Sequence, residues 1–338
     1  MIYFKQSMNI EYLEKLLVDE PKFRLKQVRT AIFKDLIDNW PQATSLPLNL
    51  REKLAVHYPL KINAQVFASS DGQAIKVLIT LEDGKKIEAV LMKHKDNRHT
   101  VCVSCQVGCS LACSFCATGR MGFKRNLTAG EILEQVLFFA RFLKNKNEKV
   151  TNVVFMGMGE PFLNYENVLA AIRLLNDKDG FNLGARHISI STAGITEGIK
   201  KLSEEKIQVN LAISLHAANG KLRRKIMPVD KKYPLAKVLA AVDDYVKITH
   251  RRVMFEYLLI KGVNDAEQDA RELARLMKRP LCFVNLISYN PTGDFIPSPT
   301  LAVKKFREIL EKAGITVTER FRFGRDIKAA CGQLATKN

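Results

Sequence analysis

The chain has 338 residues, of which 47% are hydrophobic and 26% are charged. These values are ordinary for a globular protein and exclude both a disordered chain and a small module held together by disulfides. The formal net charge of +18 predicts a polyanionic partner such as nucleic acid, bound less tightly as salt rises. Charge alone leaves two alternatives open, a role in solubility only and a partner that is a protein.

Targeting signals are not apparent in the sequence. The first twenty residues lack a basic start followed by an apolar run, so they do not look like a secretory signal. No stretch of about 18 apolar residues occurs, which argues against a membrane span, and we expect a cytoplasmic protein. Seven cysteines, an odd number, then predict reduced thiols that serve metal binding or catalysis rather than disulfides.

Residues 1–95 are predicted to form an accessory domain. Two helical patterns are followed by three strand-like runs, at 10–20 and 26–40, then at 62–69, 74–81 and 85–92. Asp-Gly pairs separate the strand-like runs, and such pairs are typical of hairpin turns. We expect a helical cap and a three-stranded meander. The second helical pattern is basic in its segment RLKQVRTAIFK. It is either a second RNA-binding surface or an ordinary solvated face.

Residues 96–338 show six strand patterns that alternate with helical patterns. The strand patterns span 100–107, 150–157, 186–192, 209–217, 252–260 and 282–290, and the helical patterns span 128–143, 166–177, 195–204, 234–248, 265–278 and 300–314. Apolar strands that alternate with helices predict a parallel sheet covered by helices. The predicted fold is α/β, a partial (β/α)6 barrel, with its chemistry at the C-terminal ends of the strands.

Three cysteines, Cys109, Cys113 and Cys116, lie within eight residues. A 4Fe-4S cluster is normally held by four thiolates, so three ligands would leave one iron free to bind another molecule. The alternative is a zinc site made by Cys102 and Cys105 with Cys113 and Cys116. That site would leave Cys109 without a role, and its spacer of seven residues is shorter than the roughly 15 to 20 of common zinc motifs.

The spacing of these cysteines, ahead of an alternating α/β chain, resembles the signature of the radical S-adenosylmethionine (SAM) superfamily. Eight ordered segments are similar to the RlmN/Cfr family of RNA adenine methyltransferases, from about residue 20 to the C-terminus. They are CVSCQVGCSLACSFCATGRMGFKRNL, FMGMGEPFLN, ISISTAGI, AISLHA, RRKIMPV, GVND, LISYNP and FGRDIKAACGQL. The resemblance implies a 4Fe-4S cluster on the three cysteines and SAM on the free iron, with cleavage to a 5'-deoxyadenosyl radical.

The same resemblance implies roles for further residues. Gly159 and Glu160 fall near the methionine amino group of SAM, and a carboxylate can accept hydrogen bonds from an ammonium group. The remaining SAM-contacting positions are Ser191, Ser214, Leu215, His216 and Asn290.

The resemblance also implies three residues that take part in transferring the methyl group and releasing the product. Cys331 corresponds to the cysteine that is methylated by a first SAM, and a second SAM activates that methyl group for addition to the base, so two SAM molecules are used per turnover. Cys102 corresponds to the thiol that releases the product by forming a disulfide, and Glu88 to the proton acceptor. We expect the basic segment before Cys331 to lower the pKa of its thiol, and its loop to be mobile.

The resemblance implies carbon 2 of an adenosine in the peptidyl-transferase centre of 23S rRNA as the target, with adenosine 37 of tRNA as a second candidate. The base would have to be flipped out of its stack. The segment GMGEPFLN, with Pro161, resembles the members of the family that methylate carbon 2. The alternative is Cfr-type methylation of carbon 8. A remote alternative is an RNA-binding protein that is stabilised by zinc and has no catalytic activity. An electron donor such as flavodoxin with flavodoxin reductase is implied, and we expect a monomer. Cys105 stands where the family has Ser, and, like Cys282, it is predicted to be a packing residue.

Overall fold

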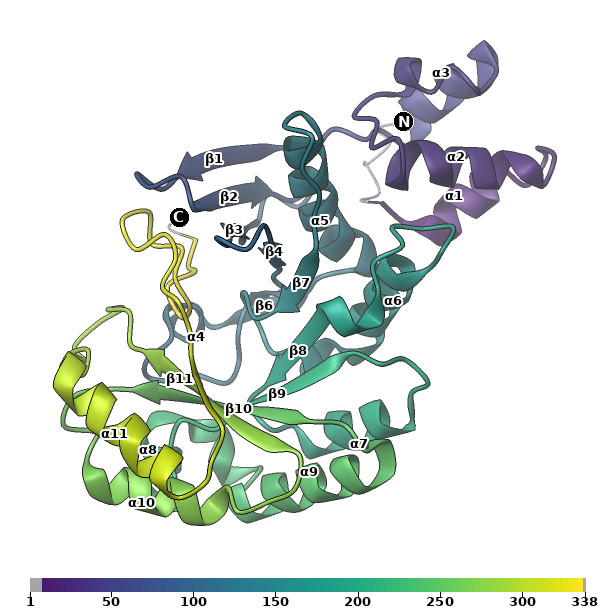
Figure 1. Ribbon diagram of the computed structural model, residues 1–338. Helices are drawn as coiled ribbons and strands as arrows, with labels where there is room; N and C mark the ends of the chain where they lie inside the picture. Colours follow the sequence, from purple (N-terminus) through teal and green to yellow (C-terminus); the bar gives the residue numbers. More distant parts are fainter. Residues whose placement is uncertain (1–7, 337–338) are drawn as a thin grey trace.

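One sheet of ten strands runs through the protein, in the order β1-β2-β3-β4-β7-β8-β9-β10-β11-β12 (Figure 1). The structure is a computed structural model that describes residues 8–336. The strands are β1 (Ala64–Ala68), β2 (Ala74–Thr80), β3 (Lys86–Lys93), β4 (His99–Cys102), β7 (Asn152–Phe155), β8 (Ile188–Thr192), β9 (Asn210–Ser214), β10 (Val253–Leu259), β11 (Cys282–Ser288) and β12 (Val317–Glu319). Within this ten-stranded sheet, every neighbouring pair from β4 to β12 is parallel.

Helices connect these parallel strands and lie along the outer side of the curved sheet (Figure 1). They are α5 (Ala129–Lys144), α6 (Tyr165–Asn176), α7 (Thr196–Glu204), α9 (Leu235–Thr249), α10 (Glu267–Leu276) and α11 (Thr300–Lys312). All six predicted helices and five of the six predicted strands are present as single elements; the strand predicted at 100–107 is divided between two sheets. The strands are apolar almost throughout because side chains on both faces of a parallel sheet are covered. The predicted α/β barrel architecture is confirmed.

The N-terminal part adds helices α1 (Ile10–Leu16), α2 (Phe23–Phe33) and α3 (Leu48–His57) and the antiparallel strands β1 to β3. The predicted meander is present, and its Asp-Gly turns have glycines with positive φ, +68° at Gly72 and +76° at Gly84. Strand β3 pairs with β4, placing Val90 opposite Cys102. The sheet is therefore continuous across residue 95, and the division into two domains there stays a prediction.

A small hairpin that the sequence did not predict leaves the main sheet after β4. The strand pattern at 100–107 is divided in two, because β5 (Gln106–Gly108) pairs with β6 (Phe123–Asn126) instead of continuing β4. A Cβ atom on Gly108 would lie only 1.8 Å from the carbonyl oxygen of Gly122, so the close crossing requires glycine. This crossing fixes the start of the segment that carries the three clustered cysteines.

Several short elements complete the fold. They are α4 (Ala117–Arg120), α8 (Gly220–Ile226) and the 3-10 turns η1 (Trp40–Gln42), η2 (Pro161–Asn164), η3 (Ala185–His187) and η4 (Pro228–Lys231). After β12, the C-terminal segment passes along the open side of the barrel and reaches the β1–β2 hairpin (Figure 1), where the backbone N–H of Ser70 donates to Asp326. Among residues 8–336, no helix has the length and apolar character needed to cross a membrane.

Candidate active site

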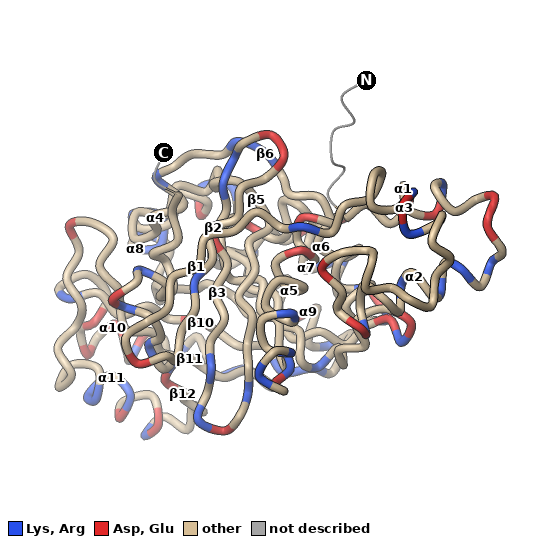
Figure 2. Tube along the Cα trace, turned by 90° about the horizontal axis from the view of Figure 1, so that it is seen from above, with Lys and Arg blue, Asp and Glu red and all other residues tan. Residues whose placement is uncertain are grey.

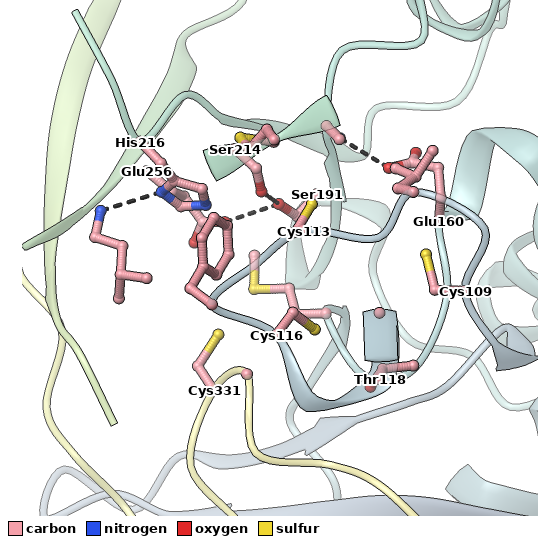
Figure 3. A pocket seen from close by; sticks show the side chains of 18 of the residues that line it. Cys109, Cys113, Cys116, Thr118, Glu160, Ser191, Ser214, His216, Glu256 and Cys331 are labelled. Carbon is pink, nitrogen blue, oxygen red and sulfur yellow. Dashed lines mark hydrogen bonds between the residues drawn. The ribbon is translucent and has the colours of Figure 1, made fainter. Parts of the chain in front are cut away.

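The loop between β5 and α4 carries Cys109, Cys113 and Cys116, and all three line one cavity at the C-terminal ends of the strands (Figure 3). Burial raises the pKa of Cys109 to about 12 and that of Cys113 well above its ordinary value. Without a metal these two thiols therefore keep their protons at neutral pH. Metal binding would displace the protons, since thiolates are the ligands.

The arrangement of the cysteines fits a cluster rather than a single ion. Within the described part of the chain, no three His, Cys, Asp or Glu side chains converge closely enough to hold one metal ion. Each thiolate of a 4Fe-4S cluster binds a different iron, so its three ligands do not need to converge. Cys102 lines a different cavity, and Cys105 is buried with its thiol 3.6 Å from the carbonyl oxygen of Met158. The four cysteines of the zinc alternative are thus not assembled into one site.

Glu160 forms one wall of this cavity, after β7 and directly before η2. Its carboxylate accepts backbone hydrogen bonds from Phe162 at 3.1 Å and from Ala193 at 2.8 Å. Burial outweighs these bonds and raises the pKa of Glu160 to about 6. Gly159 has a φ of +101°, and a Cβ atom there would lie 2.5 Å from the Cβ of Gln106. The glycine is needed to bring the carboxylate into the cavity, where a bound ammonium group would stabilise its charge.

A row of polar groups crosses the opposite wall (Figure 3). Ser191 at the end of β8 donates to Glu256 at 2.7 Å and lies 3.3 Å from the hydroxyl of Ser214. Glu256 also accepts a hydrogen bond from Arg320 at 2.6 Å. Sequence reasoning missed Glu256 and included Arg320 only as one of several basic residues. The available signal was the single carboxylate within the apolar strand β10, since a buried charge requires a partner.

Leu215 and His216 follow β9. The backbone N–H groups of both residues donate to the carbonyl oxygen of Glu256, at 3.0 and 3.2 Å. His216 lines the cavity and its Nδ1 accepts from the backbone N–H of Leu258 at 3.1 Å. Burial lowers its pKa to about 3, so the ring is neutral. Leu215 is fully buried and is not among the residues that line the cavity.

Cys331 lies on the C-terminal loop and lines this first cavity and also a second one. Two hydrogen bonds join the loop to the cysteine segment: the backbone N–H of Ala117 donates to the carbonyl oxygen of Gly332 at 2.8 Å, and the hydroxyl of Thr118 donates to that of Leu334 at 2.6 Å. Asn290 lines the second cavity and donates to the carbonyl oxygen of Cys331 at 3.3 Å. Its buried Oδ1 has no hydrogen-bond partner among the described residues, which leaves an acceptor for a ligand.

The second cavity brings Cys102 and Cys331 together, as their proposed partnership requires. Burial, and to a smaller extent the neighbouring Cys331, raise the pKa of Cys102 to about 12. The pKa of Cys331 was predicted to be lowered by basic neighbours. Arg320 does act in that direction, but burial of the thiol outweighs it, and the pKa is raised. Cys331 is an exposed residue of the C-terminal loop, and its sulfur points into the first cavity (Figure 3).

Glu88, on β3, is buried but lines neither cavity. Its Oε1 lies 2.9 Å from the ammonium group of Lys76, and its Oε2 accepts from the backbone N–H of Ala335 at 2.9 Å. Both carboxylate oxygens are therefore occupied. The contact with Ala335 joins the accessory strands to the loop that carries Cys331.

Comparisons with known proteins agree with this arrangement. Residues 103–274 match the Radical SAM superfamily. The chain is 47% identical to a probable dual-specificity RNA methyltransferase RlmN of Dictyoglomus turgidum, over 93% of this chain and 91% of that protein. It is 43% identical to the ribosomal RNA large subunit methyltransferase N of Nitrosopumilus maritimus, over 96% of each chain.

A solved structure is similar over almost the whole length. The crystal structure of a radical SAM methyltransferase from Sphaerobacter thermophilus superposes with a TM-score of 0.93 at 45% sequence identity, covering 97% of this chain and 98% of that one. The superfamily implies a 4Fe-4S cluster and SAM, which the three clustered cysteines and the cavity beside them can accommodate. The chain therefore belongs to the RlmN family of radical SAM RNA methyltransferases.

Proposed function

We propose that this enzyme methylates carbon 2 of an adenosine in the peptidyl-transferase centre of 23S rRNA, and adenosine 37 of tRNA, through a methyl group carried on Cys331. The observation that carries the proposal is that Cys331 lines two cavities, one with the clustered cysteines and one with Cys102. The words "dual-specificity" and "large subunit" in the relatives' names support two kinds of RNA substrate.

The first cavity is assigned to the cofactors. Cys109, Cys113 and Cys116 would hold the 4Fe-4S cluster, and Glu160 would accept hydrogen bonds from the amino group of SAM. The other residues assigned to SAM are Gly159, Ser191, Ser214, Leu215, His216 and Asn290. Leu215 would act through its backbone, and Asn290 would act from the adjoining second cavity, which shares Cys331 with the first. When bound, the cluster and SAM supply the radical chemistry that an unactivated carbon-hydrogen bond demands.

Cys331 is assigned the transfer of the methyl group. Its thiolate attacks the methyl carbon of a first SAM, so that a bond between sulfur and carbon forms on Cys331 as the corresponding bond in the donor breaks. Arg320, beside the sulfur, stabilises the thiolate. A second SAM is needed for each turnover because the first has given up its methyl group.

Release of the product is assigned to Cys102 and Glu88. The Cys102 thiolate attacks the sulfur of Cys331, so that a disulfide forms as the bond between this sulfur and the methylene carbon of the attached base breaks. The electron pair of the broken bond goes to that carbon, which takes up a proton and becomes the methyl group of the product. The proton from the ring carbon passes to Glu88 once Ala335 no longer occupies its Oε2. The disulfide is later reduced by an external thiol. This order requires the C-terminal loop to move, because the same loop holds both Cys331 and Ala335.

The charge of the protein supports an RNA substrate. The net charge is +18, and Lys and Arg are distributed over both the barrel and the N-terminal helices rather than in one tail (Figure 2). We infer that the N-terminal helices form a second RNA-binding surface. We also propose that the enzyme acts in the cytoplasm as a monomer, and that it receives electrons from a donor such as flavodoxin with flavodoxin reductase.

Analysis of methylated nucleosides tests the function. Purified, cluster-containing enzyme is incubated with 23S rRNA fragments and with tRNA. The RNA is then digested to nucleosides, which are separated and identified by mass spectrometry. We expect 2-methyladenosine from both substrates. Detection of 8-methyladenosine would instead assign the carbon 8 reaction, and its absence would support Pro161 as a mark of the carbon 2 branch. No methylated adenosine from either RNA would contradict the proposal.

A further inference from the structure

The rim of the second cavity carries a row of aromatic rings. Phe321 and Phe323 meet edge to face with ring centroids 4.9 Å apart, and Phe323 meets His94 in the same way at 4.8 Å. All three side chains line the cavity that contains Cys102 and Cys331. Phe323 is 7% exposed, whereas Phe321 is 57% exposed. We call the group formed by His94, Phe321, Arg322 and Phe323 the aromatic ledge.

The aromatic ledge is preformed. Gly324, with a φ of +56°, packs so closely that a Cβ atom there would lie 2.8 Å from the Cβ of both Ala74 and Ala329. Asp326 accepts a hydrogen bond from the backbone N–H of Ser70 at 2.8 Å. These contacts fix the segment after β12 on the β1–β2 hairpin. Exposing Phe321 on a fixed segment costs hydrophobic free energy, and a bound ring would recover it.

Basic side chains outnumber acidic ones beside the aromatic ledge, where Glu319 and Asp326 are the acidic neighbours. Arg322 also lines the cavity, and Arg325 and Lys328 follow on the exposed segment. Within residues 8–336, these three side chains form no ion pair at 4 Å or less, whereas Arg320 in the same segment is paired with Glu256. Unpaired cations beside an exposed aromatic ring are the combination that binds single-stranded nucleic acid, because bases stack on the ring and phosphates meet the cations.

We infer that the aromatic ledge stacks an unpaired RNA nucleobase that is adjacent to the adenosine being methylated. This inference depends on the proposed function, in which the target base reaches the sulfur atoms of Cys102 and Cys331. Cys102 is buried and Phe321 is exposed, so the target occupies the deep end of the cavity and its neighbour lies at the rim. A base-paired neighbour could not stack there, since its faces are covered by the adjacent pairs.

The test uses an RNA hairpin with 2-aminopurine next to the target adenosine in its loop. Stacking on an aromatic ring changes the fluorescence of 2-aminopurine, which reports the contact independently of activity. We compare the wild type with Phe321→Leu, which keeps apolar area but removes the ring, and with Phe321→Tyr, which keeps the ring. Ile248→Ala, which removes an exposed apolar side chain on α9, controls for non-specific effects.

The wild type, Phe321→Tyr and Ile248→Ala should change the fluorescence alike. Phe321→Leu should abolish the change and weaken RNA binding about tenfold or more, as expected for one lost stacking contact. Arg322→Gln should reduce the slope of log affinity against log salt by about 1. If Phe321→Leu matches the wild type in fluorescence and affinity while the wild type methylates the RNA, the aromatic ledge is not an RNA contact and the proposed function stands. If the wild type neither binds nor methylates RNA, both proposals fail.

Discussion

The Nη1 atom of Arg320 lies 3.8 Å from the sulfur of Cys331. The guanidinium is held in this place by Glu256, which accepts from its Nη2 at 2.6 Å. Burial alone would make the Cys331 thiol a poor nucleophile, since it raises the pKa and the thiolate is the reactive form. Arg320 is the largest influence in the opposite direction. Glu256 offsets part of this effect, because its own charge raises the pKa of Cys331, but it holds the positive guanidinium beside the sulfur that must accept a methyl group.

Replacing Arg320 by Gln should make Cys331 less reactive. The pKa of the thiol is already raised by burial, and loss of the positive charge raises it further, so a smaller fraction is ionised at any pH below the pKa. We expect alkylation of Cys331 by iodoacetamide to be severalfold slower near neutral pH, with its pH profile displaced to higher pH. The measurement is mass spectrometry of the Cys331 peptide from cluster-free protein over a range of pH.

Arg325→Gln is the matched control, because Arg325 is in the same basic segment but is exposed and forms no ion pair among the described residues. It should leave the alkylation profile of Cys331 unchanged. Equal profiles for Arg320→Gln and the wild type would show that Arg320 does not set the reactivity of Cys331.

Substitution of any one clustered cysteine should remove the iron. Cys109→Ala, Cys113→Ala and Cys116→Ala each leave two thiolates, too few to retain the cluster, so bound iron and methylation should both be lost. Cys105→Ser is the control: among residues 8–336 its buried thiol hydrogen-bonds to the carbonyl oxygen of Met158 and to no other group, and iron content and activity should stay near the wild-type level. Iron analysis and visible absorption after anaerobic reconstitution provide the measurement. A full cluster in one of the three variants, or its loss in Cys105→Ser, would contradict the ligand set.

The main elements of the fold could be predicted because their signals are local. Periodic apolar residues define the strands and helices, and Asp-Gly pairs define the hairpin turns. The break between β4 and β5 could not be predicted, because it depends on Ser104, whose backbone N–H donates to Gln135 at 2.7 Å and whose hydroxyl donates to the carbonyl oxygen of Glu88 at 2.6 Å. Those partners are 31 and 16 residues away in the sequence, so a short sequence pattern cannot predict these hydrogen bonds.

The same distinction applies to the site. Cysteine spacing and short motifs identified the residues now assigned to the cluster, to SAM and to methyl transfer. They did not reveal that Arg320 reaches Glu256 across 64 residues, or that Ala335 reaches Glu88 across 247. They also gave the wrong direction for the pKa of Cys331. Basic residues near Cys331 are visible in the sequence, whereas burial of its sulfur depends on the whole fold.

Binding of SAM should weaken at acid pH through Glu160. Its pKa is raised to about 6 by burial, so the group is a carboxylate above that pH and is neutral below it. An ammonium group is bound well only by the carboxylate form. We expect the affinity of reconstituted enzyme for SAM, measured by calorimetry, to be constant above about pH 7 and to fall as the pH falls through 6. Glu160→Gln should bind weakly at every pH; a wild-type affinity that does not change between pH 5 and 7 would argue against this role.

The order of events at the two thiols can be tested with two single substitutions. Cys331→Ala removes the atom that carries the methyl group, so the RNA should remain unmodified and no covalent species should form. Cys102→Ala blocks a later step: the base becomes attached to Cys331 through the methyl carbon, but no thiol attacks the sulfur to release it. Cys102→Ala should therefore accumulate a protein-RNA adduct that survives denaturing electrophoresis and disappears after nuclease treatment.

Cys282→Ser is the control for the loss of a thiol, since Cys282 begins β11 and lines neither cavity; it should methylate RNA without accumulating an adduct. Activity alone cannot separate the two cysteines, because Cys331→Ala and Cys102→Ala should both be inactive. The adduct separates them, because it requires Cys331 to be present and Cys102 to be absent. If Cys102→Ala forms no adduct under conditions in which the wild type methylates RNA, Cys102 does not release the product, and its position beside Cys331 in the second cavity needs another explanation.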